Sequence, residues 1–283
     1  MFTSSSAFND AAYSEVITDD NIMTLTHFDL TELPYHGGST FSSGVLPKWD
    51  IHDNTYMIKR CGIDEYGNYL TDAVNEELVY LFCKSLNINA AYYRTVMIRY
   101  RDAETNKIIE APAVLTKIFD GLVHYVDIRR TFSFGQAQDE LLDLTERFNI
   151  MPALNDIFFL DFIFNQQDRH SKNIGLIGND LSPIFDSGAC LLYDILDSEL
   201  SPSYYDRIPK HKTFGKPLDE LLKFSLSYVY CGFSFTFDAD NIKTVFESAF
   251  QTVQHHYGGE RIKFIKEFVN RRIDCFGQIL AEA

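Results

Sequence analysis

Short apolar runs flanked by polar residues occur in two stretches of the first part of the chain, 55–60 (TYMIKR) and 95–102 (TVMIRYRD). Both are rich in β-branched or aromatic residues and are bounded by the turn-forming sequences DEYGN and DAETNK. Such runs are typical of β-strands. We therefore expect the region from about Met23 to Val114 to be mainly sheet.

One helix interrupts this region, at residues 72–86 (DAVNEELVYLFCKSL). Its apolar side chains recur every three or four positions, which is the period of a helix with one buried face. Asp72 stands where an N-cap residue is expected. The apolar positions are Val74, Leu78, Leu81, Phe82 and Leu86.

After Thr116 the pattern becomes mainly helical, and most of the predicted helices have Asp, Pro or Glu near their starts. The segment IFFLDFIF could also be a buried strand, but Pro152 before it, Asn155 as a cap and its total length favour a buried helix. The predicted helices are DELLDLTERF (139–148), PALNDIFFLDFIF (152–164), PLDELLKFSLSYVY (217–230), DADNIKTVFESAFQTV (238–253) and ERIKFIKEFVNRRIDCFGQILAEA (260–283).

A sheet-rich part joined to a helical part predicts an α+β fold with two lobes. We expect a first lobe over 1–116 and a second over 117–283. With 283 residues, of which 46% are hydrophobic, the chain can bury a substantial core.

The composition favours a soluble cytoplasmic protein. No apolar run reaches the roughly 18 to 20 residues of a membrane span, and the N-terminus lacks the features of a signal peptide. The five cysteines contain no CxxC pair, so neither a disulfide framework nor a zinc cage is indicated.

The net charge of −15 argues against direct binding of nucleic acid or of anionic membranes. The same charge means that any nucleotide site must concentrate cationic side chains, backbone N–H groups or Mg2+ around the phosphates.

Two acids and an amide stand in the segment 166–188, QQDRHSKNIGLIGNDLSPIFDSG. Asp168 and Asn173 have the spacing of the catalytic-loop aspartate and asparagine of kinases, and Asp186 stands where a metal-binding acid would follow. Asp168 would then be the base, and Asn173 and Asp186 would hold Mg2+. The intervening IGLI and SPIFD are predicted to be short strands. The plainer interpretation is two ordinary turns.

Lys59, at the end of a predicted strand, is the candidate for binding nucleotide phosphates. A carboxylate on the helix 72–86 would aim it, with Glu76 the first candidate and Glu77 the second. On its own, a lysine on a strand is usually a solvated surface residue.

A stretch rich in glycine and serine, PYHGGSTFSSGVLPKW, precedes this strand. Its glycines, Gly37, Gly38 and Gly44, would let backbone N–H groups approach phosphate oxygens. An ordinary hairpin loop is the alternative. If the loop covers phosphates, self-phosphorylation at its hydroxyls is expected to interfere with ATP binding. These hydroxyls belong to Ser39, Thr40, Ser42 and Ser43.

Residues 168–173 (DRHSKN) and 181–188 (LSPIFDSG) together resemble the HipA-like kinases, whose catalytic loop reads D-x-H-x-K-N and whose metal-binding acid lies in a Y/F-D turn. V-N-E at 74–76 is similar to the E-N-E of that family, T-K-I-F-D at 116–120 resembles its hinge, and G-G-S followed by P-K-W resembles its glycine loop. The resemblance covers roughly residues 28–200.

This resemblance implies a bilobal protein-kinase-like fold that uses ATP and Mg2+ to phosphorylate serine or threonine. It implies Asp168 as base, with Lys172 reaching the γ-phosphate. The hinge, with Lys117 and Phe119 in 114–121, would hold adenine. The implied ATP-binding set is Lys59, Glu76, Gly38, Ser39, Ser42, Ser43, Lys117 and Phe119, and the metal ligands are Asn173 and Asp186.

Family members of the toxin type phosphorylate aminoacyl-tRNA synthetases and pair with a small antitoxin protein, so the resemblance implies such partners here. We expect the chain to lack the small N-terminal subdomain of longer members.

Two other functions stay open. Phosphoinositide kinases carry D-R-H-x-x-N, which Arg169 matches, but they need a basic membrane-facing surface. A catalytically silent kinase-fold binding module is the third candidate, although the expected lysine, base and metal acid are all present.

Overall fold

The chain divides into two compact units, the first made of Met1–Glu77 and Tyr92–Phe119 and the second of Leu78–Ala91 and Asp120–Ala283. The computed structural model describes residues 18, 21–35, 46–131, 147–148, 150–209, 211–228 and 232–282. The boundary expected at residue 116 lies close to the end of the first unit, whereas residues 78–91 group with the second unit.

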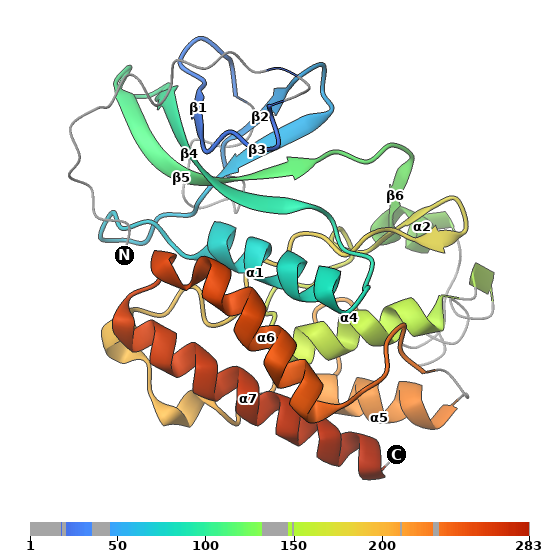
Figure 1. Cartoon of the computed structure of the whole chain (residues 1–283). Coiled ribbons are helices and arrows are strands. Elements are labelled where there is room, and N and C mark those ends of the chain that lie inside the picture. The colour runs from blue at the N-terminus through green and yellow to red at the C-terminus, as the bar shows by residue number, and fades with distance from the viewer. Residues whose placement is uncertain are drawn as a thin grey trace. The chain divides into compact units, whose positions relative to one another are not determined.

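The first unit contains a five-stranded sheet in the order β1-β4-β5-β3-β2. β1 pairs in parallel with β4, and the other neighbours are antiparallel. The two strands expected from the sequence are confirmed as β3 and β4 (Figure 1). The strands are β1 (His27–Asp29), β2 (Lys48–Ile51), β3 (Tyr56–Arg60), β4 (Tyr93–Arg101) and β5 (Ile108–Lys117).

Aromatic side chains fill one part of the core of this unit. The Trp49 ring lies 5.2 Å from that of Tyr100 and 5.4 Å from that of Tyr35, measured between ring centroids. Ile58 and Ile98 belong to the same buried cluster. Burial of the apolar side chains along β3 and β4 fixes the register, because a shift by one residue would turn them outward.

The helix expected at 72–86 is confirmed as α1 (Asp72–Ser85). The prediction that Asp72 is its N-cap is wrong. Asp72 is the first residue of the helix, and its buried carboxylate accepts hydrogen bonds from the backbone N–H of Gly62 at 3.1 and 3.2 Å. Asp72 therefore ties the start of α1 to the residues that follow β3.

The second unit is mainly helical. In Figure 1, α6 and α7 lie side by side, and α4 and α5 both contact α7. A small sheet, β6-β7-β8, completes the unit. The helices are α2 (Tyr125–Thr131), α4 (Met151–Ile163), α5 (Leu218–Tyr228), α6 (Ala239–Val253) and α7 (Gly259–Glu282), with short 3-10 helices η2 (Asp197–Glu199), η3 (Pro202–Tyr204) and η4 (Gln254–His256). The strands are β6 (Leu122–His124), β7 (Gly175–Ile177) and β8 (Asp180–Leu181).

The segment IFFLDFIF lies within and just after the buried helix α4, as predicted, but Asn155 does not cap it. The helix begins after Ile150, and Asn155 lies inside it, where its side-chain amide donates to the carbonyl of Gly232 at 3.3 Å. Four of the five predicted helices are confirmed as α4 to α7. The remaining predicted helix is 139–148, and most of it, residues 139–146, lies outside the described residues.

α4 is buried on nearly all sides, and most of its residues are apolar. The Phe159 ring lies 4.8 Å from that of Phe276 on α7. It lies 6.3 Å from that of Phe82. Within the part of the chain described above, no helix combines the length and hydropathy needed to cross a membrane.

The prediction that SPIFD forms a strand is wrong. β8 is only Asp180–Leu181, and Ile184 makes a single bridge to Ala90. Pro183 has no N–H to donate, which limits a continuous ladder at this point. The residues before Asp186 therefore lie largely outside a sheet.

Candidate active site

In the second unit, a loop after α4 carries Asp168 and Asn173. The backbone N–H of His170 donates to the carbonyl of Asp168 at 2.8 Å, and that of Asn173 donates to the carbonyl of His170 at 2.8 Å. The side-chain amide of Asn173 also donates to the Asp168 carbonyl, at 3.0 Å. The loop is thus closed on itself around the backbone of Asp168, while the Asp168 side chain is 42% exposed.

Arg169 holds this loop to α4. Its buried guanidinium donates from Nε and Nη2 to the carboxylate of Asp161, at 2.9 to 3.2 Å. Both side chains are 1% exposed. Such a two-pronged pair has the fixed geometry that a guanidinium and a carboxylate make best.

The same guanidinium also holds the turn that carries Asp186. Nη1 donates to the carbonyls of Asn173, at 3.3 Å, and of Phe185, at 2.5 Å. Nη2 donates to the hydroxyl of Ser187 at 3.0 Å. One buried side chain therefore joins α4, the loop with Asn173 and the turn with Asp186.

Asp186 itself has a left-handed backbone conformation, with φ of 54°. Outside glycine this conformation is strained, although Asp tolerates it better than most residues. Its carbonyl accepts a hydrogen bond from the side-chain amide of Gln166 at 3.0 Å. Arg169 binds the residues on both sides of Asp186, Phe185 and Ser187. Together with the bond from Gln166, three hydrogen bonds therefore hold the backbone around Asp186.

Asn173 and Asp186 have side chains of the two kinds expected for Mg2+, an amide and a carboxylate. The amide of Asn173 uses its nitrogen to bind the Asp168 carbonyl, which directs its remaining acceptor, Oδ1, away from that bond. Asp186 adds a carboxylate. Mg2+ prefers such oxygen donors and usually takes only one or two from a protein, the rest coming from water and phosphate.

His211 packs against the Arg169–Asp161 pair. Its Nε2 lies 3.6 Å from Asp161 Oδ2, and its ring stacks on Phe214. Its Nδ1 accepts the backbone N–H of Phe214 at 3.4 Å, so the neutral ring carries its proton on Nε2. Burial, together with the positive charge of Arg169, lowers the pKa of His211 to about 3.

The Nζ of Lys212, a residue that no motif in the sequence singles out, lies 2.5 Å from Asp168 Oδ1. Lys172 has an exposed side chain and a backbone N–H that donates to His170 Nδ1 at 3.2 Å, and its expected contact with the γ-phosphate stays a prediction. Lys212 lies 44 positions after Asp168 in the sequence, so neither loop pattern nor spacing indicates the contact.

In the first unit, the expected ion pair of Lys59 with Glu76 is present. Glu76 is fully buried and Lys59 is 12% exposed. Glu77, the second candidate, accepts the backbone N–H of Thr95 at 2.8 Å instead. Asp72 and Glu76, one helical turn apart, thus face the end of β3, and the phosphate-binding role of Lys59 stays a prediction.

The predicted hinge at 114–121 begins inside the sheet. Residues 114–117 are the last part of β5, where Lys117 pairs with Tyr56 in β3. Only the residues after Lys117 leave the sheet, and a turn lies at Gly121, with φ of 74°. Lys117 is exposed and Phe119 is half-buried.

The predicted phosphate loop lies outside the described residues, which omit 36–45. This range contains Gly38, Ser39, Ser42 and Ser43.

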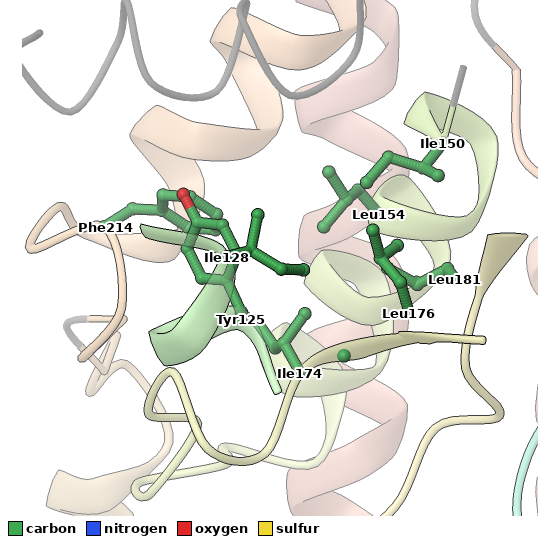
Figure 2. A pocket seen from close by; sticks show the side chains of 9 residues that line it. Tyr125, Ile128, Ile150, Leu154, Ile174, Leu176, Leu181 and Phe214 are labelled. Atoms are coloured by element: carbon green, nitrogen blue, oxygen red, sulfur yellow. The ribbon is translucent and has the colours of Figure 1, made fainter. Parts of the chain in front are cut away.

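A small apolar cavity in the second unit does not add a ligand site. Figure 2 shows side chains from α2, α4 and the strands β7 and β8 around it, among them Tyr125, Leu154 and Leu176. Its volume of about 10 Å³ has room for about one water molecule. It is a small gap in the core beside the loop with Asp168.

No family model matches this chain, and no curated protein matches it either.

Replacing Asp161 by Asn tests the buried pair. The variant leaves the charge of Arg169 buried without its carboxylate, and we expect the free energy of unfolding to fall by about 3 to 5 kcal/mol. Urea denaturation measures it. The matched control is Asp127→Asn, which removes an exposed pair with Arg130 and should change the free energy by less than about 0.5 kcal/mol. Equal effects would contradict the role given to Asp161.

The burial of neutral His211 predicts that the folded protein loses stability in acid. Its pKa in the folded protein, about 3, is lower than the ordinary value of 6.5. The unfolded chain therefore takes up a proton first, and stability is lost as the pH falls from 6.5 towards 3. Below pH 6, the wild type should lose up to about 1.4 kcal/mol per pH unit more than His211→Asn. Urea titrations at several pH values measure the free energy of unfolding of both proteins. If this free energy fell with pH equally in the wild type and in His211→Asn, His211 would be protonated in the folded protein and the prediction would be contradicted.

Proposed function

We propose that this chain is an ATP- and Mg2+-dependent serine/threonine protein kinase of the HipA-like type, with a bilobal protein-kinase-like fold. The observation that carries the proposal is the set of bonds from Arg169. They hold the loop with Asp168 and Asn173 and the turn with Asp186 to one buried carboxylate, Asp161. Two unrelated surface turns would not need a shared buried cation.

In this proposal Asp168 orients the acceptor hydroxyl and takes its proton. The exposure of its side chain supports this role, because an acceptor must reach it. The acceptor oxygen attacks the γ-phosphorus of ATP, and the bond to the β-phosphate oxygen breaks to release ADP.

Asn173 and Asp186 would hold Mg2+, which neutralises phosphate charge when bound. Mg2+ binding requires the Asp186 carboxylate to be presented in a fixed direction. The three bonds that fix the backbone around Asp186 support this.

In the first unit, Lys59 would bind ATP phosphates and Glu76 would aim it. An ammonium held by a buried carboxylate has one preferred direction, whereas a free lysine on a strand has many. Lys117 and Phe119 are proposed to contact the nucleotide base. The glycine- and serine-rich loop is proposed as a site of autophosphorylation.

A protein acceptor is favoured over a lipid. Arg169 was the feature shared with phosphoinositide kinases, but its guanidinium is buried and binds only other parts of the chain. It therefore gives no support to a lipid substrate. The acidic net charge of −15 also opposes binding to anionic membranes.

The proposal places the reaction in the cytosol, where ATP is abundant. Cys61, Cys83 and Cys190 are buried free thiols, which agrees with a reducing compartment. By resemblance to toxin-type members, the partners would be a component of translation as substrate and a small antitoxin.

Two substitutions separate binding from transfer. Asp186→Ala should lower Mg2+-dependent ADP release at least about 100-fold, because it removes a metal ligand. Asp168→Asn should lower it similarly but leave nucleotide affinity within about twofold, because the base does not hold ATP. Coupled-enzyme assays measure ADP, and calorimetry measures binding.

The control is Asp180→Asn, which changes an exposed carboxylate on β8 and should leave both quantities as in the wild type. Undiminished ADP release in Asp186→Ala would contradict the metal assignment. ATP binding without turnover in the wild type would favour the silent binding module.

A further inference from the structure

Lys212 contacts the proposed base without an obvious structural reason. Its ammonium lies 2.5 Å from Asp168 Oδ1, yet the two side chains are 54% and 42% exposed. An exposed pair of this kind is worth about 0 to 1 kcal/mol, so stability does not explain it.

The turn that carries Lys212 is bound to the loop of the proposed base. Thr213 donates to the carbonyl of Arg169 twice, from its backbone N–H at 3.2 Å and from its hydroxyl at 2.9 Å. Arg169 follows Asp168 directly in the chain. Lys212, which precedes Thr213, is therefore attached close to Asp168 through the backbone and not only through its flexible side chain.

The turn is also closed and anchored on its other side. The N–H of His211 donates to the carbonyl of Lys216, and that of Gly215 to the carbonyl of His211, both at 2.8 Å. Gly215 has φ of 66°, which glycine adopts without strain. The buried His211 ring packs edge-on against Phe158 of α4.

Of the cationic side chains that lie beside Asp168 in the described residues, Lys212 is better placed for a substrate than Arg169. The guanidinium of Arg169 is buried and occupied by Asp161 and two carbonyls. His170 Nε2 lies 3.9 Å from the other carboxylate oxygen, Asp168 Oδ2. Lys212 binds Oδ1 and leaves Oδ2 to an acceptor hydroxyl, while the Lys212 side chain is 54% exposed.

We propose that Lys212 is a catalytic residue that binds the oxygens of the phosphoryl group during its transfer. This role rests on the proposed kinase function. The acceptor hydroxyl gives its proton to Asp168, its oxygen bonds to the γ-phosphorus, and ADP leaves with the electrons of the broken P–O bond. Lys212 keeps its proton throughout and stabilises negative charge on the transferring group.

The experiment measures Mg2+-dependent ADP release by the full chain with ATP as the probe, for the wild type, Lys212→Ala and Lys212→Arg. Removing one group that stabilises transition-state charge typically costs about 100-fold in kcat. We expect that loss in Lys212→Ala with KM for MgATP changed by less than about twofold, because the contact strengthens during transfer. The kcat of Lys212→Arg should be at least about tenfold higher than that of Lys212→Ala.

The matched control is Lys216→Ala, in the same turn, which should keep the kcat and KM of the wild type. Melting temperatures of all variants should agree, since Lys212 is half exposed. A purely structural role would not produce a selective loss of kcat that arginine restores.

An active wild type with an unchanged or faster Lys212→Ala variant overturns the role of Lys212 and leaves the kinase proposal intact. A wild type without ADP release contradicts the kinase proposal and the role of Lys212 with it.

Discussion

The buried ion pair between Arg169 and Asp161 is the interaction on which the candidate site depends. Removing a guanidinium and a carboxylate from water is costly, and this cost is offset only when nearly every hydrogen-bonding group is satisfied. Here the guanidinium reaches one carboxylate, two backbone carbonyls and one hydroxyl. The cost of burial therefore specifies one arrangement of the loop and the turn.

A second consequence concerns charge. A chain with a net charge of −15 repels phosphates unless its cations are placed precisely. Lys59 and Lys212 are each held by a carboxylate, Glu76 and Asp168 respectively. Such pairing aims an ammonium at a fixed point and, in the case of Lys212, leaves it half exposed. In the proposed account, phosphate oxygens bind to these oriented cations and not to a diffuse basic surface.

Much of the fold follows from local sequence patterns. The period of apolar residues correctly located α1, which buries one face, and α4 was correctly taken as a helix from its length and from Pro152 near its start. The pairing of Lys59 with Glu76 also followed from the sequence, since a strand and the helix after it are neighbours along the chain. Local patterns were misleading where tertiary contacts decide. Asp72 binds Gly62 instead of capping its helix, and Pro183 limits the strand expected in SPIFD.

The site was only partly predictable. The order and spacing of Asp168, Asn173 and Asp186 are visible in the sequence. The sequence does not show that Arg169 joins the segments that carry them. Arg169 was interpreted by its likeness to another kinase class, because the sequence does not show that its guanidinium is buried. The contact of Lys212 with Asp168 could not be predicted because it spans 44 positions, whereas the prediction for Lys172 came from its place in the loop and stays a prediction.

The most direct test of the central claim is the intact mass of the purified full chain before and after incubation with ATP and Mg2+, with ADP measured in the same sample. The account predicts that ADP forms and that the protein gains phosphoryl groups, which peptide mapping would locate within residues 36–48. EDTA should prevent both. Neither ADP nor a gain in mass, in a sample whose melting temperature shows it to be folded, would contradict the account.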